Sequence, residues 1–468
     1  MEWFRAIPVL IASLIFSVLI LFFLSDSSAI SGFHFIKLGL QFSKLDLART
    51  KEFLTRSYSA AVLENSTTIN NSVTTVQRKY GQMRGVEIGL AQARAAIQRA
   101  KKLNGSKISL TENEDAKRGQ VYRNPTAFYQ SYLEMEKSFK VYVYEEGEAP
   151  IVHDGPCKNI YTSEGRFISE MEIMSGGFRT CDPDRAHVYF MPFSVTMMVE
   201  MLWRQSRDVG ALRRFAWDYV RAISTKYPYW NRTQGADHFM LTCHDWGPLS
   251  SMGEPFLYNN SIRVLCNANS SEGFNPTKDA TLPEIFLYDG TMPSDLANIP
   301  DFKTPRPHLG FFAGGQHGWI RKVLFDHWKN RDRDLLVLDY LPEGLSYYPM
   351  MLKSKFCLCP SGHEVASPRI TEAIYAECVP VIISDHYVLP FSDVLRWVAF
   401  SVRVDPVDIP KLKDILSAIP KEEYMKLKQG VRAVRRHFVL NQPPKSSSID
   451  ESTKDQQYRV SYLRPSHN

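Results

Sequence analysis

Cysteine is scarce in this chain: only seven of its 468 residues are cysteines. Cysteines this sparse exclude the disulfide framework with which small secreted domains replace a hydrophobic core. The sequence also lacks Cys-x-x-Cys and His-x-x-x-His patterns, so nothing indicates a zinc site. The formal charge is +6, but no block of lysine and arginine is present. This argues against a nucleic-acid partner and supports at most a mild attraction to anionic substrates.

Apolar residues, in contrast, are plentiful: 44% of the chain is hydrophobic and 12% aromatic, enough for two domains of ordinary size plus appendages. Ile7–Leu24 is an almost unbroken apolar run, close to the roughly 20 residues that a membrane span needs. We interpret it as a single-pass signal-anchor behind a cytoplasmic tail, residues 1–6. A signal peptide cleaved near Ser27–Ala29 is the alternative. Basic residues on both sides of the run leave its orientation undecided.

Features after the apolar run indicate a secretory lumen. Six Asn-x-Ser/Thr sites follow it, and such sites are used only in that compartment. Their asparagines are Asn65, Asn70, Asn104, Asn231, Asn259 and Asn269. The cysteines are spaced as local bridges, Cys157 with Cys181, Cys243 with Cys266 and Cys357 with Cys378, which leaves Cys359 over, although spacing alone proves no pairing.

Residues 25–135 are interpreted as a lumenal stalk, because their first hundred residues are rich in Ser, Thr, Asn, Lys and Arg and lack cysteine. Val86–Leu103 is its one strong helix, with Ile88, Ala91 and Ala95 on one side. We interpret this helix as a spacer or an oligomerising element. The polar tail, residues 441–468, is expected to be disordered.

The first folded domain, residues 136–300, is predicted to contain four strands and a long helix over residues 197–226. Its strands are Phe139–Tyr144, Ala186–Phe190, His238–Thr242 and Ile262–Cys266. Strands separated by helices predict a mostly parallel, covered sheet, which binds ligands beyond the carboxyl ends of its strands. Cys243–Pro248 follows such an end, so His244 or Asp245 is the candidate catalytic base. The alternative is that both residues merely brace a turn.

The second domain, residues 301–440, is predicted to begin with a strand over Pro305–Phe312. Gly314 and Gly315 then let the backbone approach a ligand before a helix over Trp319–Lys329, whose first turn carries Arg321. A simple tight turn is the alternative. A strand at Leu335–Leu338, a helix at Tyr347–Lys353 and a closing helix at Lys421–Phe438 complete the prediction.

Lys355–Asp385 is the most informative stretch, and it predicts a strand at Phe356–Cys359, a helix and a second strand at Val379–Ile383. Ser367 is predicted to cap the helix, Pro368 to be its first residue and Cys378 to lie near its end. Its polar side carries Arg369 and Glu372, near free amides that favour an anion. Seven residues separate Glu364 from Glu372. At this spacing one carboxylate can reach a sugar while the other accepts hydrogen bonds from ribose hydroxyls. The alternative is that both are solvated carboxylates near the helix end.

Several motifs in a fixed order resemble the exostosin-type glycosyltransferase family, family 47, and most of all its plant cell-wall branch. The resemblance covers roughly Phe139 to Phe438. Its motifs are Tyr189–Phe193, Asp237–Phe239, His244–Pro248, Lys278–Glu284, Phe311–Gly314, Ser354–Leu358 and Ser367–Glu372.

The resemblance implies a Golgi type II membrane protein with an α/β, GT-B-like fold of two facing Rossmann-type domains. The reaction implied is transfer of a sugar, with inversion, from a nucleotide sugar such as a UDP-sugar to a polysaccharide or glycan of the cell wall. Arg321 would bind the diphosphate, Ser367 and Arg369 would lie at the helix end, and Glu372 would bind the ribose.

No metal and no other cofactor are expected. The strings Asp182-Pro183-Asp184 and Asp332-Arg333-Asp334 resemble metal-binding Asp-x-Asp motifs but are interpreted as turn residues. A second class of function is a catalytically silent scaffold that supports a partner transferase in a homo- or hetero-oligomer. Loss of donor residues would mark such a protein, whereas Arg321, Arg369 and Glu372 are all present.

Overall fold

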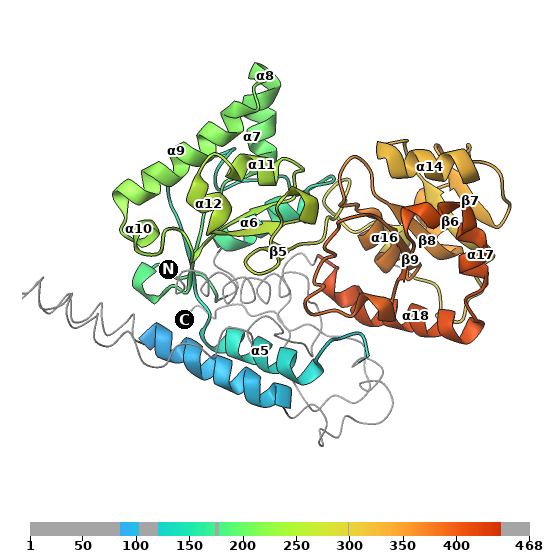
Figure 1. Cartoon of the computed structure of the whole chain (residues 1–468), viewed down its shortest axis with the longest axis horizontal. Helices are drawn as coiled ribbons and strands as arrows, with labels where there is room; N and C mark the ends of the chain where they lie inside the picture. The colour runs from blue at the N-terminus through green and yellow to red at the C-terminus, as the bar shows by residue number, and fades with distance from the viewer. Residues whose placement is uncertain (1–84, 103–119, 174–176, 298, 441–468) are drawn as a thin grey trace, which may run out of the picture.

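The computed structural model describes residues 85–102, 120–173, 177–297 and 299–440. Two lobes lie side by side, and a pair of long helices runs along one side of the molecule (Figure 1). The predicted anchor, the tail and the acceptors Asn65, Asn70 and Asn104 fall outside the described residues. Among the helices that are described, none combines the length and apolar character that crossing a bilayer requires.

The first lobe is built on a five-stranded parallel sheet in the order β1-β2-β3-β4-β5. Its strands are β1 (Val141–Val143), β2 (Val188–Phe190), β3 (His238–Thr242), β4 (Ile262–Leu265) and β5 (Ala280–Thr281). Its helices are α5 (Pro125–Ser138), α6 (Thr162–Ile173), α7 (Val195–Met198), α8 (Arg204–Ser206), α9 (Gly210–Lys226), α10 (Tyr229–Thr233), α11 (Gly247–Ser251), α12 (Pro255–Asn259) and α13 (Ser294–Ala297). Shorter turns are η2 (Pro183–Arg185), the π-helix η3 (Val199–Trp203) and η4 (Ser270–Glu272).

Both faces of this sheet are covered, as predicted. Alternate residues of β1 point to opposite faces, because side chains alternate along a strand. Val141 and Val143 join the apolar cluster that contains α6, whereas Tyr142 and Tyr144 join the cluster that contains α9. The carboxyl edge of the sheet is therefore the part left open to a ligand.

The prediction of a single long helix over residues 197–226 is wrong. Arg207 adopts a left-handed backbone with φ of 55°, which ends the helical run that leads into it. The Asp208 carboxylate accepts a hydrogen bond from the N–H of Gly210 (2.7 Å). A short acidic side chain that bonds a nearby amide favours the start of a new helix over continuation of the old one. The run therefore divides into α7, η3 and α8 before this break and α9 after it.

The second lobe has a parallel sheet in the order β10-β9-β8-β6-β7. Its strands are β6 (His308–Ala313), β7 (Leu335–Leu338), β8 (Ser354–Pro360), β9 (Val379–Ile383) and β10 (Val402–Arg403). Its helices are α14 (Gly318–Trp328), α15 (Tyr347–Leu352), α16 (Arg369–Tyr375), α17 (Leu412–Ser417) and α18 (Lys421–Val434), with short turns η5 (Trp397–Ala399), η6 (Pro406–Lys411) and η7 (Arg435–His437).

Strand order distinguishes the two lobes. The second lobe reverses direction between β6 and β8, which is the doubly wound arrangement that binds ligands at the point of reversal. The first lobe runs through its strands in sequence without a reversal. The predicted α/β class with parallel sheets is confirmed. A doubly wound, Rossmann-like order is present in the second lobe, and the expectation of two such lobes is wrong for the first.

The predicted cap of α16 is also wrong. Pro368 already has helical backbone angles (φ −64°, ψ −20°) and is the residue that precedes Arg369 at the helix start. The Ser367 hydroxyl makes no capping bond; it is buried and has no hydrogen-bond partner. The helix also ends earlier than expected, at Tyr375, because Glu377 adopts a left-handed backbone with φ of 48°.

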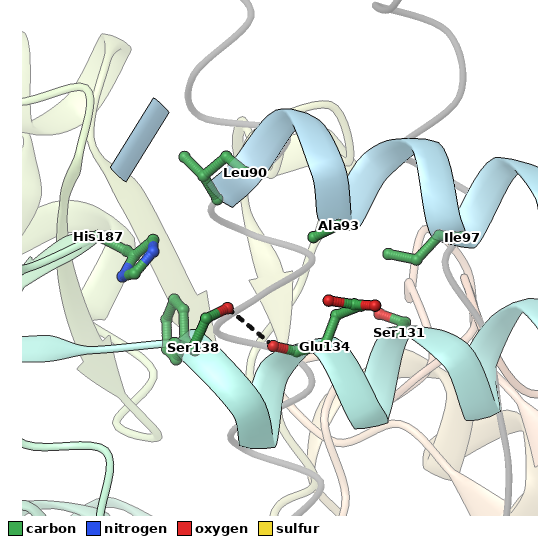
Figure 2. Close-up of a pocket in the computed structure, with 8 residues that line it drawn as sticks. Leu90, Ala93, Ile97, Ser131, Glu134, Ser138 and His187 are labelled. Atoms are coloured by element: carbon green, nitrogen blue, oxygen red, sulfur yellow. Dashed lines mark hydrogen bonds between the residues drawn. The ribbon is translucent and has the colours of Figure 1, made fainter. Parts of the chain in front are cut away.

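The helix of residues 85–102 packs along α5 and is therefore part of the globular body. Figure 2 shows Leu90, Ala93 and Ile97 pointing toward α5, where Ser131 and Glu134 lie. These three residues have helical spacing, whereas the side predicted to be apolar, marked by Ile88, is exposed. The cavity left between the helices is only about 10 Å³, close to the least that one water needs. The folded body therefore begins earlier than the predicted residue 136.

Two of the three predicted cysteine bridges are formed, Cys243–Cys266 and Cys357–Cys378. The third is wrong, because Cys157 and Cys181 are free thiols, as is Cys359. Cys157 precedes α6 and Cys181 follows it, so a helix of 12 residues, about 18 Å long, separates the chain segments that carry them.

The described glycosylation acceptors differ in accessibility. Asn231 and Asn259 are exposed, and their use stays a prediction. Asn269 is buried, and its side-chain oxygen accepts a hydrogen bond from the N–H of Ser271 (3.0 Å). A buried amide has no room for a glycan, so Asn269 is a wrong prediction in the folded chain.

Candidate active site

The carboxyl edge of the first sheet is held by Glu164, a residue of α6 that the sequence analysis did not single out. One carboxylate oxygen accepts hydrogen bonds from the Ser194 hydroxyl (2.5 Å) and the N–H of Thr196 (3.0 Å). The other accepts from the Thr242 hydroxyl (3.0 Å) and the N–H of Cys243 (2.8 Å). Glu164 thus fixes the segments that follow β2 and β3 relative to each other. The Cys243–Cys266 bridge ties the end of β3 to the end of β4.

His244 and Asp245 follow β3 at this edge, and their environments separate them. The Nδ1 atom of His244 accepts a hydrogen bond from the N–H of Trp246 (3.0 Å), which leaves the ring proton on Nε2. Burial lowers the pKa of His244 to about 4. Burial, aided by Glu364 and Glu272, raises the pKa of Asp245 to about 7. His244 is therefore neutral and braces a turn, whereas Asp245 is poised to exchange a proton near neutral pH.

Arg321 and Arg369 converge from α14 and α16 on the loops that follow β6 and β8. Their guanidinium groups lie over the same ring, that of Phe312, at 5.8 and 5.1 Å from its centroid. Arg321 donates to the carbonyls of Pro360 and Gly315 (both 3.3 Å), and Arg369 donates to the carbonyl of Ala313 (3.1 Å). Burial, and then the positive charge of Arg369, lowers the pKa of Arg321 to about 10.

Neither arginine forms an ion pair with a carboxylate among the residues that the structure describes, and the Nε of Arg369 is buried without a partner. Buried charges in proteins are normally paired, so two adjacent unpaired guanidinium groups mark a site for an anion. The site lies where the second sheet reverses its strand order, which is the expected ligand position for a doubly wound sheet.

Gly314 allows the close approach that this site requires. A Cβ atom at this position would lie 2.1 Å from a guanidinium nitrogen of Arg369. Gly315 follows and supplies the carbonyl that Arg321 contacts. The two glycines predicted from the sequence therefore lie at the arginine pair.

The two carboxylates predicted from their spacing occupy different environments. Glu372 is buried, and its carboxylate accepts a hydrogen bond from the Tyr347 hydroxyl (3.0 Å). Burial raises the pKa of Glu372, although Arg369 and the Tyr347 bond oppose the rise. Glu364 instead accepts a hydrogen bond from the Asn267 amide (2.8 Å), which joins the two lobes. Neither is a solvated helix-end carboxylate, and Arg321 and Glu372 both lie in the protein interior.

Glu284 is a second residue that sequence reasoning missed, although its motif, Lys278–Glu284, carried part of the family resemblance. It follows β5 and reaches the junction of the lobes, where its backbone carbonyl accepts a hydrogen bond from the Thr371 hydroxyl of α16 (2.9 Å). Only 4% of its surface is exposed. Nothing in the local sequence Leu-Pro-Glu predicts that Glu284 lies beside α16, because only the tertiary fold brings the two together.

Both Asp-x-Asp strings have the structural roles expected of turn residues. The Asp182 carboxylate accepts from the N–H of Asp184 (3.0 Å) and caps η2. The Asp332 carboxylate accepts from the N–H groups of Asp334 (2.8 Å) and Leu335 (2.9 Å) and pairs with Lys413 (2.5 Å).

Comparison with known proteins gives the class of this chain. The family model described as the exostosin GT47 domain matches residues 135–419. A probable glycosyltransferase of Arabidopsis thaliana is 57% identical over 377 residues, covering 80% of this chain and 78% of its own length. A probable glucuronosyltransferase of Oryza sativa subsp. japonica is 31% identical over 336 residues, covering 65% of this chain and 77% of its own. The crystal structure of TarM matches 45% of this chain and 53% of its own at 10% identity, and its TM-score of 0.24 is too low to bear on the fold.

The arginine pair lies where the second sheet of this two-lobed α/β protein reverses its strand order. The chain belongs to the exostosin GT47 family, in its plant branch, and glycosyl transfer is the reaction class of its named relatives.

Proposed function

We propose that this protein is an inverting glycosyltransferase with a GT-B-like arrangement, which moves a sugar from a nucleotide-sugar donor, a UDP-sugar, to a cell-wall polysaccharide or another glycan. The observation that carries the proposal is a pair of adjacent arginines, the buried Arg321 and the half-buried Arg369, that has no carboxylate partner among the described residues. A diphosphate supplies the missing negative charge, and the arginine fork matches phosphate geometry.

The proposed reaction is a direct displacement. The Asp245 carboxylate takes the proton of an acceptor hydroxyl while that oxygen attacks the anomeric carbon of the donor sugar. The bond from that carbon to the diphosphate oxygen breaks, and its electron pair leaves with the nucleoside diphosphate. Arg321 and Arg369 stabilise the charge that develops on the leaving group. Attack opposite to the leaving group inverts the anomeric carbon. No step calls on a metal, and the absence of a metal cofactor stays a prediction.

Glu372 is proposed to accept hydrogen bonds from the ribose hydroxyls. Tyr347 already occupies one of its oxygens at 3.0 Å, so the ribose would bond the remaining lone pairs. Glu364 is a weaker candidate for contact with the sugar, because it holds Asn267 of the other lobe. The rice relatives are named for glucuronosyl transfer.

The diphosphate assignment is tested by calorimetry of UDP and of uridine. Arg321→Ala removes charge-assisted bonds worth roughly 1.5–3 kcal/mol each, so UDP binding should weaken about ten- to a hundredfold, whereas uridine binding should change little. Lys322→Ala is the matched control, since this neighbour on α14 is exposed and pairs with Asp326. Because Arg321 is buried, thermal unfolding of each variant must accompany the titrations.

Two other results would each revise the proposal. Equal UDP affinity in wild type and both variants would place the nucleotide elsewhere. No UDP binding by the folded wild-type protein would favour the second candidate function, a catalytically silent scaffold that supports a partner transferase.

We also propose a lumenal position in the Golgi, with a single-pass type II anchor at Ile7–Leu24. The two disulfides support it, because such bonds persist in oxidising compartments. Peptide mapping of the protein from plant membranes, without reduction, should recover Cys243–Cys266 and Cys357–Cys378 as linked pairs. Cys157, Cys181 and Cys359 should be recovered as thiols. Finding Cys243 and Cys266 reduced in the native protein would contradict the lumenal assignment.

A further inference from the structure

Glu284 is a buried carboxyl group that the proposed reaction does not yet use. Its side chain has no hydrogen-bond partner within the part of the chain that the structure describes, although only 4% of the residue is exposed. Buried polar groups are nearly always hydrogen-bonded, and leaving one unsatisfied is costly. The backbone of Glu284 is anchored on both sides: its own carbonyl bonds Thr371 (2.9 Å), and that of Pro283 bonds Ser163 (2.8 Å). The carboxyl is therefore held in place without a partner.

The charged neighbours of Glu284 belong to both halves of the site. Asp245 of the first lobe acts on it electrostatically, and so do Arg369, Glu372 and Arg321 of the second. Burial is the main cause that raises the pKa of Glu284 well above its ordinary value, and the two acidic neighbours add to the rise while the arginines oppose it. Glu284 thus lies among charged groups that come from both lobes.

Two further unsatisfied groups lie next to the same helix. The Ser367 hydroxyl and the Arg369 Nε are both buried without partners, and Ser367, Arg369 and Thr371 belong to one short segment at the start of α16. Glu284 contacts this segment through Thr371. Two buried polar atoms without partners, beside a carboxyl group that makes no hydrogen bond among the described residues, indicate a site suited to a polar ligand.

We propose that Glu284 forms the sugar subsite of the donor: its side-chain carboxyl group hydrogen-bonds hydroxyl groups of the monosaccharide that is transferred. This inference rests on the proposed function. In a displacement, the sugar lies between the group that takes the acceptor proton and the groups that hold the diphosphate. Glu284 is close enough to Asp245 and to the two arginines to interact electrostatically with all three. Arg321 and Arg369 are proposed to contact the diphosphate. The monosaccharide is therefore the part of the donor that Glu284 would contact.

Two near-isosteric substitutions separate this role from a structural one. Glu284→Gln keeps a neutral donor and acceptor, whereas Glu284→Met keeps the volume and removes both. Because the carboxyl has no protein partner to lose, neither change is expected to lower the melting temperature. Glu254→Gln is the matched control, since Glu254 is a buried carboxylate that caps α12 through the N–H of Leu257 (2.5 Å).

The test is calorimetry of each protein with UDP and with UDP-glucose, UDP-galactose, UDP-xylose, UDP-arabinose and UDP-glucuronic acid. For the UDP-sugar that wild type binds best, Glu284→Met should weaken binding about tenfold relative to wild type, as expected for the loss of one to two hydrogen bonds, and UDP affinity should be unchanged. Glu284→Gln should stay within about threefold of wild type. The Glu254 variant should keep the wild-type ratio of UDP-sugar to UDP affinity.

Three outcomes would overturn the inference. Equal weakening of UDP and UDP-sugar in Glu284→Met would assign Glu284 to the nucleotide. A large fall in melting temperature with an unchanged affinity ratio would make it a structural residue. Weakening in Glu284→Gln as great as in Glu284→Met would mean that hydrogen bonding by a side chain of this shape does not explain the loss. Failure of wild type to bind UDP at all would instead overturn the proposed function and this inference with it.

Discussion

Asp245→Asn is expected to lower kcat by about 10²–10⁴, the usual contribution of a positioned general base. Asparagine has almost the same shape but cannot accept the proton of the acceptor hydroxyl. The donor site lies on the other lobe, so the affinity for UDP should stay close to that of wild type. Initial-rate measurements with a UDP-sugar identified by the calorimetry, together with a UDP titration, check both expectations. A kcat within tenfold of wild type would exclude Asp245 as the base.

The pH dependence of the same reaction has a defined sign. Burial raises the pKa of Asp245 to about 7, and the base is active only when it is deprotonated. The wild-type rate should therefore rise with pH through about 7 and level off above it. The residual rate of the asparagine variant should lack this rise. His244 would not produce the profile, since the pKa of its ring is lowered to about 4.

Asp279→Ala is expected to destabilise the protein by about 3–5 kcal/mol, the cost of breaking one side of a buried ion pair. The Asp279 carboxylate holds the guanidinium of Arg263 (2.6 Å) and the ammonium of Lys278 (2.6 Å). It also accepts from the backbone N–H groups of Arg263 (3.1 Å) and Asn275 (2.9 Å). Alanine would leave two buried cations without their counter-charge. Chemical denaturation measures the loss.

Asp326→Ala is the control for this prediction. Its partner Lys322 is 62% exposed and its own side chain 54%, and exposed pairs contribute little. A similar loss of stability in the two variants would mean that burial of the Asp279 cluster is not what stabilises it. Asp279 also begins the segment that ends at Glu284, so its loss should disturb donor-sugar binding before the protein unfolds.

The apolar runs predicted most of the strands, because a buried parallel strand needs a nearly continuous apolar sequence. His238–Thr242, Leu335–Leu338 and Val379–Ile383 have the predicted bounds. Sequence could not give the order of the strands, which depends on pairing between distant segments. The reversal between β6 and β8 therefore became visible only in the fold.

The candidate site, like the fold, could be predicted only in part from the sequence. Arg321, Arg369 and Glu372 follow from local rules about glycine turns and helix starts, and all three lie together. Glu164 and Glu284 were missed because ordinary helical or loop sequence surrounds them, and their positions depend on contacts more than 75 residues away along the chain, at Thr242 and Thr371. The Ser367 cap failed for the opposite reason: the local preference was sound, but Pro368 begins the helical turn in its place.

The segment just before α5, which belongs to the first lobe, also contacts the second lobe. Tyr122 forms an antiparallel bridge with Leu395, and its hydroxyl bonds the His437 ring (2.7 Å). The N–H of Arg123 donates to the carbonyl of Val394 (2.9 Å). For protein engineering, the lobes are therefore not interchangeable modules cut at a single point near residue 300. A chimera that takes its donor half from a relative must also take the relative's counterpart of residues 121–123, or it will pair two surfaces that did not evolve together.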